Sequence, residues 1–596
     1  MRELLSGNEA IARGAWEAGV RLAAAYPGTP STEILQNMAE YKEIESQWSP
    51  NEKVATEVAL GASIAGARSL AVMKHVGVNV AADPLFTASY TGVGGGFVLV
   101  TADDPAMHSS QNEQDNRNYA RFAKIPMFEP SDSQEAKDLV RVAFEISEEF
   151  DTPVLFRTTT RISHSKSIVE LGERVELPAL TTLEKDVPKY TMLPGFAKLK
   201  HPKVEQRITD LKKRAETLPV NRIEMGDSAV GIIATGTVYQ YAREAFPQAS
   251  FLKLGMTYPL PRKMIEEFRS KVERLYVVEE LDPFLEEQIY LMDVKLDGGK
   301  DLFSLCGELD PGAVARGLTA GGATGAEPTL LLPPPAEAAG LPQRPPTFCP
   351  GCSHRGVFTV LKKLRVFVSG DIGCYTLGAL PPIGAMHTCV CMGASIGMAH
   401  GMSKVVDAQG DIKNRAVAVI GDSTFFHSGV TGLMDTIWNR GASVTIILDN
   451  RTTAMTGGQQ NPGSGNTLDG EPASMVDLTK LVEALGVKRV ARIDPYDLAQ
   501  TERVIREELE AGEPSVIIAT APCVLEFKIK NDPWTIDENL CNGCKRCLRV
   551  GCIALNLVEE GEKTLVEIDP IQCNGCGVCA QMCNFDAILA PEPVKA

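Results

Sequence analysis

Eight of the fifteen cysteines lie in two tight groups near the end of the chain. One group has the spacing C-x-x-C-x-x-C-x-x-x-C, and the other has one extra residue before its last cysteine. Three thiolates spaced in this way can wrap one iron–sulfur cubane, while the fourth is carried away by the following turn. The spacing therefore predicts two [4Fe–4S] clusters and single-electron transfer. The two groups are Cys541, Cys544, Cys547 and Cys552, and Cys573, Cys576, Cys579 and Cys583.

Crossed ligation, as in bacterial two-cluster ferredoxins, assigns the last cysteine of each group to the cluster of the other. Zinc is the alternative, but zinc ribbons do not normally use three closely spaced cysteines twice. The proline that usually follows the fourth cysteine is replaced by Ile553 and Asn584, which leaves the ligands intact. The predicted sets are Cys541, Cys544, Cys547 and Cys583, and Cys573, Cys576, Cys579 and Cys552.

A further group of polar residues lies where two predicted strands end. Gly421, Asp422 and Ser423 end a buried strand and open a helix, and Asn450 ends the next strand. A diphosphate needs a hard cation with oxygen ligands and backbone N–H groups at a helix start. Strand ends of α/β sheets are where ligands usually bind. We expect Asp422, the Asn450 side chain and the Thr452 carbonyl to hold Mg²⁺, although a Gly-Asp-Ser triplet alone is more often a plain turn.

This arrangement resembles the GDG…N motif of thiamine diphosphate enzymes, with Ser423 in place of the second glycine. Such enzymes need a carboxylate from a separate pyrimidine-binding domain, which favours the imino tautomer of the cofactor. Glu52 is the second residue of the sequence NEKVATEVALGASIAGARS. It resembles that glutamate, because its distance to Gly61 fits the family pattern. Glu57 is the competing candidate, and a solvated helix face carrying both is the alternative.

Other motifs resemble the 2-oxoacid:ferredoxin oxidoreductase family over almost the whole chain. Residues 26–31, YPGTPS, are similar to its YPxTPS element, and CPGC at 349–352 with GDIGC at 370–374 is similar to its CPGC…GIGC element. The sequence TGGQ, with Gly457 as an expected cofactor contact, follows the magnesium motif. The domain order, KHVGVN at 74–79 and GCYTLG at 373–378 are similar to the α subunits of indolepyruvate-type enzymes.

This resemblance implies oxidative decarboxylation of arylpyruvates such as indolepyruvate and phenylpyruvate. Coenzyme A and oxidised ferredoxin would be co-substrates, and aryl-acetyl-CoA, carbon dioxide and reduced ferredoxin would be products. The implied cofactors are thiamine diphosphate, Mg²⁺ and two [4Fe–4S] clusters. The alternatives are a non-oxidative thiamine diphosphate-dependent decarboxylase and an electron-relay subunit with an inactive thiamine fold.

The same resemblance implies roles in the first domain. Thr29 would bond the substrate carboxylate or the intermediate. His75 would donate a hydrogen bond near the reacting carbon, unless it is a satisfied packing histidine. Arg117 and Arg121 are candidates for pairing with the carboxylate, against the alternative of surface salt bridges.

A third cluster is one interpretation of the earlier cysteines. In related enzymes the CPGC and GIGC cysteines hold a further cubane together with one later cysteine. The other interpretation is structural thiols, because Cys389 and Cys391 suggest that this domain carries buried thiols freely. The comparable positions for the third cluster are Cys349, Cys352, Cys374 and Cys523.

The elements that must position these residues alternate between helical patterns and short apolar strands. This alternation predicts α/β architecture with several doubly wound parallel-sheet domains of the thiamine diphosphate-binding fold and a C-terminal two-cluster ferredoxin-like domain. The expected segments are a pyrimidine-binding domain at 1–175, a charged irregular linker and a transketolase C-terminal-like α/β domain at 176–324, a Pro-rich linker at 325–346, a diphosphate- and Mg-binding domain at 347–528 and the cluster domain at 531–596.

Composition limits the partners. The 596-residue chain is too long for one core, and its formal charge of −17 argues against binding to nucleic acid or an anionic membrane. It has neither an apolar leader nor a run of about 18 apolar residues, so we expect a cytoplasmic protein. No stretch resembles the γ domain of the family. A smaller β subunit is therefore expected to supply it in an α2β2 heterotetramer.

Overall fold

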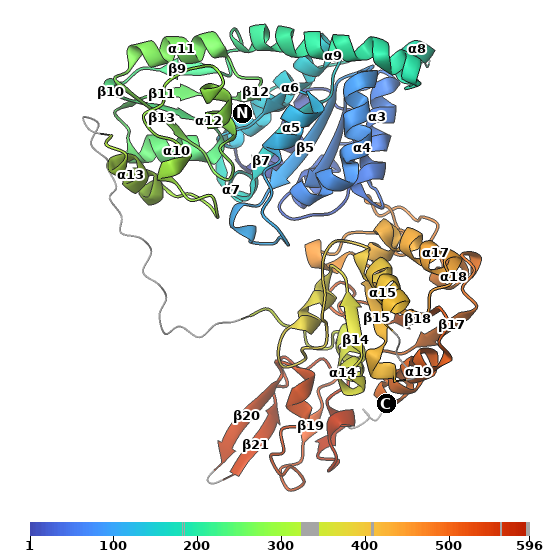
Figure 1. The fold of residues 1–596 in the computed structure, drawn as a ribbon. Helices are drawn as coiled ribbons and strands as arrows, with labels where there is room; N and C mark the ends of the chain where they lie inside the picture. Colours follow the sequence, from blue (N-terminus) through green and yellow to red (C-terminus); the bar gives the residue numbers. More distant parts are fainter. Residues whose placement is uncertain (182, 184, 324–344, 407–410, 561–562, 592–596) are drawn as a thin grey trace. The chain divides into compact units, whose positions relative to one another are not determined.

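The computed structural model describes residues 1–596 except 182, 184, 324–344, 407–410, 561–562 and 592–596. The chain divides into two compact units, Met1–Gly340 and Leu341–Ala596, shown in Figure 1. The predicted Pro-rich linker at 325–346 falls almost entirely outside the described residues. In the described part of the chain, no helix is both long and apolar enough to cross a membrane.

A seven-stranded sheet forms the centre of the first unit. Its order is β12-β6-β7-β5-β4-β2-β3, and all neighbours are parallel except β12 and β6. β4 and β5 are buried along their whole lengths, which is typical of central strands in a parallel sheet. The strands are β2 (Leu22–Ala25), β3 (Glu45–Trp48), β4 (Ser69–Lys74), β5 (Phe97–Asp103), β6 (Met127–Phe128), β7 (Val154–Thr159) and β12 (Met256–Tyr258).

Helices alternate with these strands, as the sequence predicts for a parallel α/β domain. A separate antiparallel pair, β1 (Arg2–Ser6) and β8 (Lys166–Glu170), joins the two ends of this segment. The helices are α1 (Gly7–Glu17), α2 (Thr32–Met38), α3 (Glu52–Ile64), α4 (His75–Thr91), α5 (Arg117–Ala123), α6 (Ser133–Phe150) and α7 (Thr160–His164).

A second sheet, of order β13-β10-β11-β9, completes the first unit. Leu252 and Phe268 from this part share one hydrophobic cluster with Leu85 and Phe97 of the first sheet region. β12 also lies in this part of the sequence, so the two predicted N-terminal domains form one compact unit, and the boundary at 175 stays a prediction. The remaining elements are β9 (Arg222–Glu224), β10 (Asp227–Ala234), β11 (Ala249–Lys253), β13 (Arg274–Val278), α8 (Val187–Tyr190), α10 (Gly236–Ala245), α11 (Arg262–Lys271), α12 (Phe284–Tyr290) and α13 (Pro311–Ala320).

The stretch after residue 175 is not irregular throughout, and that part of the prediction is wrong. α9 (Pro194–Ala215) is a helix of 22 residues. Its buried residues recur three or four positions apart and form one narrow apolar stripe on a strongly charged helix. The many charged residues of this segment make its helical pattern hard to recognise in the sequence. The buried residues are Val204, Ile208, Leu211 and Ala215.

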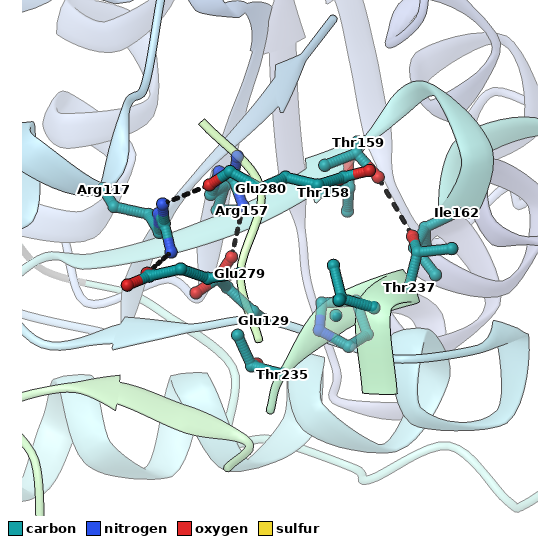
Figure 2. A pocket seen from close by; sticks show the side chains of 13 residues that line it. Arg117, Glu129, Arg157, Thr158, Thr159, Ile162, Thr235, Thr237, Glu279 and Glu280 are labelled. Atoms are coloured by element: carbon teal, nitrogen blue, oxygen red, sulfur yellow. Dashed lines mark hydrogen bonds and ion pairs between the residues drawn. The ribbon is translucent and has the colours of Figure 1, made fainter. Parts of the chain in front are cut away.

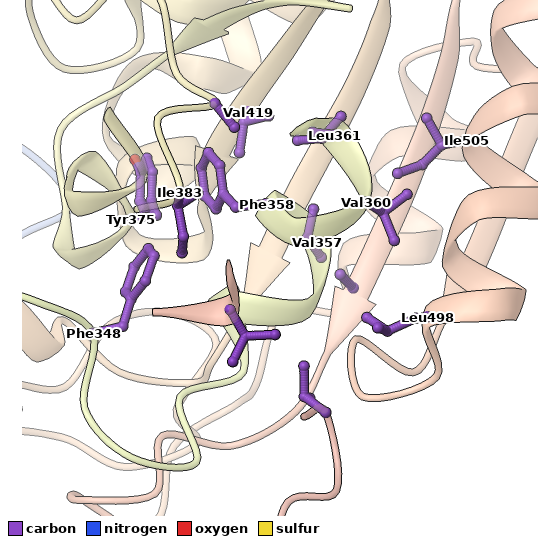
Figure 3. Close-up of a cluster of buried hydrophobic side chains, with 14 of the residues drawn as sticks. Phe348, Val357, Phe358, Val360, Leu361, Tyr375, Ile383, Val419, Leu498 and Ile505 are labelled. Atoms are coloured by element: carbon purple, nitrogen blue, oxygen red, sulfur yellow. The ribbon is translucent and has the colours of Figure 1, made fainter. Parts of the chain in front are cut away.

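The second unit contains a five-stranded sheet of order β14-β15-β16-β18-β17, in which all strands are parallel. α14 (His354–Leu364) packs its apolar face on this sheet, and Figure 3 shows Phe358 and Leu361 on the side of Val419 of β15. The elements are β14 (Phe367–Gly370), β15 (Ala416–Gly421), β16 (Val444–Asp449), β17 (Arg489–Ile493), β18 (Ser515–Thr520), α15 (Ala394–Val405), α16 (Asp422–Thr424), α17 (Val430–Trp438), α18 (Leu478–Ala484) and α19 (Leu498–Ala511).

The cysteine-rich tail is built from loops and two short antiparallel pairs. Val550, Leu555 and Val566 of the tail belong to the same hydrophobic cluster as α14, so the tail packs on the sheet domain. The α/β prediction with parallel sheets is thus confirmed for both units. The tail strands are β19 (Thr535–Ile536) with β22 (Ile588–Leu589), and β20 (Leu555–Glu560) with β21 (Lys563–Ile568).

Candidate functional site

Glu52 is the first residue of α3, and its neighbours hold it in a buried position. The Asn51 side chain caps the helix by accepting a 2.9 Å hydrogen bond from the backbone of the first turn. Glu52 is 5% exposed, and a Cβ built on Gly77 of α4 would lie 2.7 Å from its Oε1. Glu57, by contrast, is exposed and paired with Lys53. The geometry favours Glu52 over Glu57 as the enclosed carboxylate.

The loop with Thr29 and the segment with His75 follow two adjacent parallel strands, β2 and β4, at their carboxyl ends. The two segments touch, because a Cβ built on Gly28 would lie 3.0 Å from Lys74 Cβ. Asn8 Nδ2 donates a 2.7 Å hydrogen bond to the carbonyl of the residue after Thr29 and holds the loop. The structure therefore brings these two predicted substrate residues to one edge of the sheet.

His75 is fully buried at the start of α4. Its Nε2 lies 3.2 Å from both the carbonyl oxygen and the side-chain oxygen of Asn112. Its Nδ1 is also buried, and no hydrogen-bond partner for it lies among the described residues. Nε2 is thus in polar contact with Asn112, whereas Nδ1 remains able to form a hydrogen bond with a ligand.

Lys74 is a buried cation at this edge that the sequence analysis did not single out, although it begins the KHVGVN motif. Its ammonium donates a hydrogen bond to the Ser109 carbonyl, and no carboxylate of the described residues lies within 4.0 Å. Burial lowers the pKa of Lys74 to about 8, and the field of the Asp104 carboxylate opposes this effect. Because a buried ammonium without an adjacent carboxylate is costly, this position favours an anionic ligand.

The two candidate arginines are already paired within the chain. Arg117 is 1% exposed and forms ion pairs of 2.6 Å with both Asp115 and Glu279. Arg121 is exposed and pairs with Glu287 at 2.9 Å. The salt-bridge interpretation therefore fits both residues, although the pairs of Arg117 are buried rather than at the surface.

Arg117 also lines a pocket of the first unit with an empty volume of about 330 Å³. Figure 2 shows that Arg117 and Arg157 both face carboxylates in this pocket. Arg157 pairs with Asp103 at 2.8 Å and also with Glu129. Each guanidinium thus meets two carboxylates, and one nitrogen in this lining, the buried Arg157 Nη2, has no hydrogen-bond partner among the described residues.

The predicted diphosphate residues meet at one edge of the second unit. β15 ends at Gly421 and β16 ends at Asp449, and these two strands are neighbours and parallel. Asp422 is 2% exposed, and burial raises its pKa to about 7, with the Asp449 carboxylate adding to the rise. Asn461 donates to Asp422 Oδ2 at 3.2 Å. A divalent cation would stabilise the ionised form of this buried carboxyl.

The loop after β16 places the remaining residues of this set. Asn450 Oδ1 accepts a 3.2 Å hydrogen bond from the Thr452 N–H, and a bridge between Thr453 and Gln459 closes the loop. Thr453 also donates to Ser423 Oγ at 2.8 Å. Gly457 lies in the closing turn at a φ of 116°, which favours glycine.

Side chains of the usual metal-binding types do not form a compact group here. In the described residues, no three or more His, Cys, Asp or Glu side chains are arranged to hold a single metal ion. The predicted Mg²⁺ ligands are of another kind, with one carboxylate, one amide and one backbone carbonyl. Asp422, Asn450 and Thr452 are all buried, as such a set requires.

The thiols of the tail gather in crossed sets. Burial raises the pKa of the Cys547 thiol, and Cys541, Cys544 and Cys583 add to the rise. Cys583 therefore lies within electrostatic range of Cys547, as the predicted crossed ligation requires.

The second set shows the same crossing. Burial raises the pKa of Cys579 to about 12, with contributions from Cys576, Cys552 and Cys573. One small cavity is lined by all four of these thiols. Its lining cysteines are Cys552, Cys573, Cys576 and Cys579.

A third set of thiols gathers near the start of α14. Burial raises the pKa of Cys352 to about 12 and that of Cys374 to about 11, and Cys349 contributes to both. Cys523 acts on Cys374 and Cys349. The expectation that this domain carries buried thiols freely is wrong, because its other two cysteines, Cys389 and Cys391, are exposed.

Comparisons with known proteins cover both units. Residues 13–210 match the family described as pyruvate flavodoxin/ferredoxin oxidoreductase, thiamine diP-bdg, and residues 371–519 match the thiamine pyrophosphate enzyme C-terminal TPP binding domain. Indolepyruvate oxidoreductase subunit IorA of Pyrococcus horikoshii is 41% identical, over 98% of this chain and 96% of its own length. The IorA subunit of Archaeoglobus fulgidus is 40% identical, over 99% and 97%.

More distant relatives match part of the chain. The 2-oxoglutarate synthase subunit KorA of Archaeoglobus fulgidus is 26% identical, over 46% of this chain and 87% of its own length. A solved 2-oxoglutarate:ferredoxin oxidoreductase from Magnetococcus marinus has a TM-score of 0.44 at 16% identity, and it covers 54% of this chain and 65% of its own.

Proposed function

Because the chain belongs to the family of indolepyruvate oxidoreductase subunits IorA, a family of 2-oxoacid:ferredoxin oxidoreductases, we propose that it acts on arylpyruvates. The products would be aryl-acetyl-CoA, carbon dioxide and reduced ferredoxin. One observation carries this proposal. In the unit with the Asp422–Asn450 edge, the tail thiols influence one another as crossed cubane ligation would require, which supports a thiamine half-site and an electron outlet in one fold.

Each unit, taken by itself, holds residues that suit one part of thiamine diphosphate. Glu52 offers a buried carboxyl for the aminopyrimidine, and Asp422, Asn450 and Thr452 offer oxygen ligands for Mg²⁺ and the diphosphate. When bound, thiamine diphosphate supplies a nucleophile for the oxo carbon and a sink for the electrons released by decarboxylation. The task of Glu52 is to hold a proton at the pyrimidine ring.

Lys74 and Thr29 are proposed to receive the substrate carboxylate. Lys74 is the buried cation beside the loop of Thr29, and its ammonium has donor capacity beyond its bond to Ser109. His75 follows Lys74 in the sequence, and its Nδ1 is proposed to donate a hydrogen bond near the reacting carbon. This assignment replaces Arg117 and Arg121, whose guanidiniums are paired elsewhere.

The cysteine sets are proposed to hold three [4Fe–4S] clusters. Two are the crossed sets of the tail, and the third is the set near α14, Cys349, Cys352, Cys374 and Cys523. Coenzyme A is proposed as the acyl acceptor. The relatives are named as subunits, and we propose a smaller β subunit with the γ domain in an α2β2 complex, located in the cytoplasm.

The test is an anaerobic assay of the reconstituted complex with a panel of 2-oxoacids, coenzyme A and a viologen dye. We expect coenzyme A-dependent dye reduction, fastest with aromatic oxoacids. Aldehyde release that ignores coenzyme A and leaves the dye oxidised would instead establish a non-oxidative decarboxylase. If calorimetry shows no binding of thiamine diphosphate, the chain would instead be an electron-relay subunit.

A further inference from the structure

The three sets of thiols in the second unit form a series. Tyr496 connects the set near α14 with the second cysteine group of the tail, because its hydroxyl donates a 2.7 Å hydrogen bond to the Gly351 carbonyl and its own carbonyl accepts one of 2.7 Å from Gln581, between Cys579 and Cys583. Burial raises the pKa of Tyr496, and the thiolates of Cys352 and Cys576 add to the rise, which places Tyr496 near both sets. Cys547 of the remaining set acts on Cys579 of the cavity-lining set. Among the twelve cysteines of the three sets, Cys544 of the set with Cys547 is the one that is exposed, so this set is the outermost of the three.

The loop that carries this outermost set differs in charge from its counterpart. Residues 541–552 contain three cations, Lys545, Arg546 and Arg549, and no carboxylate. Residues 573–583 contain no charged residue at all. The chain as a whole has a formal charge of −17, whereas this loop is positively charged.

The three cations are exposed and unpaired. Lys545, Arg546 and Arg549 are all exposed, and none forms an ion pair or a side-chain hydrogen bond with any described residue. Arg546 precedes the 3₁₀ turn Cys547–Val550, and Arg549 lies three residues further on. Side chains three residues apart in a 3₁₀ turn share a face. Cys544, between Cys541 and Lys545, is also exposed.

We propose that the exposed side of the loop 541–552 is the docking surface for a small acidic one-electron carrier protein of the ferredoxin class. This inference rests on the proposed function, because it needs the cluster held by the outermost thiols. The two electrons removed from each oxoacid leave this cluster singly. Each one reduces one cluster of an oxidised carrier, and the one proton released, from the coenzyme A thiol, goes to solvent.

Electrostatics explains why such a surface needs local cations. An acidic carrier is repelled by a chain of charge −17, and a cluster of unpaired cations beside the exit overcomes this repulsion at short range. Complementary charge of this kind mainly sets the association rate and its dependence on salt. Two carboxylates, Asp537 and the exposed Glu538, precede the loop, so three cations stand against two carboxylates in this stretch.

The test uses the double variant Arg546→Glu/Arg549→Glu in the complete complex. Lys545 is retained because its backbone has a φ of 58°, so a substitution there could change the loop conformation as well as the charge. The matched control is Lys480→Glu/Lys488→Glu, which changes the net charge equally at exposed positions of the same unit. Iron content and viologen reduction verify that both variants keep their clusters.

Two readouts are measured with a purified acidic ferredoxin. The first is the Kd of the oxidised carrier in biolayer interferometry at low and high salt, and the second is the KM for the carrier during turnover. In the double variant we expect both to rise about tenfold or more and the salt dependence to fall, while viologen reduction stays within about twofold. The control is expected to behave as wild type.

Three results would overturn the docking surface. These are an unchanged Kd in the double variant, an equal loss in the control, or loss of the smaller subunit from the double variant in size-exclusion chromatography. The last result would mean that the subunit, not the carrier, covers the loop. A wild-type complex that reduces viologen with none of the 2-oxoacids would overturn the proposed function instead, and the Kd measurement, which needs no turnover, would still decide the docking surface.

Discussion

The carboxyl of Glu52 lies directly against Gly77, so that a Cβ on Gly77 would come within 2.7 Å of Glu52 Oε1. α3 and α4 thus approach each other at Gly77, which has no side chain. The position of the predicted catalytic carboxylate depends on this close approach.

Gly77→Ala is expected to displace the Glu52 carboxyl and to lower kcat by about tenfold or more, because a misplaced catalytic group loses rate steeply. The matched control is Gly61→Ala, since no atom lies within 4 Å of a Cβ at Gly61. In a helix this control should leave activity unchanged and stabilise the fold slightly. Steady-state kinetics and thermal unfolding of both variants check the prediction, and equal behaviour of the two would contradict it.

Glu52→Gln should reduce the coenzyme A-dependent reaction by about 100-fold or more, the usual effect of losing a general acid–base group. Glu57→Gln should stay within about twofold, because Glu57 is an exposed partner of Lys53. Calorimetry should show thiamine diphosphate binding in both variants. A greater loss of activity in the Glu57 variant would reverse the assignment.

Lys74→Met should raise the KM for the 2-oxoacid by about tenfold or more, as expected when a charged hydrogen bond is lost. Burial lowers the pKa of Lys74 to about 8, so the wild-type ammonium loses its proton, and the KM rises, as the pH passes about 8. The variant should lack this rise. KM measurements between pH 6.5 and 9.5 test both points, and a parallel rise in the two proteins would exclude Lys74.

Lys74 also has a consequence for stability without substrate. Its folded pKa lies below the ordinary value of 10.5, so the unfolded chain binds more protons between about pH 8 and 10.5, and the stability contribution of this residue rises with pH there. Lys74→Met should therefore be more stable than wild type at pH 7, and the difference should shrink above pH 8. Chemical unfolding of the first unit, followed at several pH values, measures it.

Cys523→Ser should remove one cluster from the holoprotein. Anaerobically reconstituted wild type is expected to contain about twelve iron atoms per chain, four for each of three clusters, and the variant about eight. Cys389→Ser is the control, because Cys389 is exposed and outside the three sets of thiols. Iron analysis showing about eight atoms in wild type would remove the third cluster from the proposal.

Local spacing determined what the sequence revealed. The cysteine spacings, the Gly421–Ser423 strand end and the apolar runs of β4 and β15 are each read from a few consecutive residues, and the structure has the strands where these runs predict them. Ligand spacing and strand burial are local properties, so short windows suffice for them.

Contacts between distant segments decided the rest. Whether Glu52 or Glu57 is enclosed depends on where α4 crosses α3, and whether Arg117 is available depends on Glu279, more than 160 residues further along. Lys74 is a buried cation only because the loops after β2 and β5 close over it, and Cys523 joins Cys349 only when β18 completes the parallel sheet. Burial and charge pairing are sums over neighbours in space, so the order of the residues proposes the chemistry while the packing selects the side chains that can perform it.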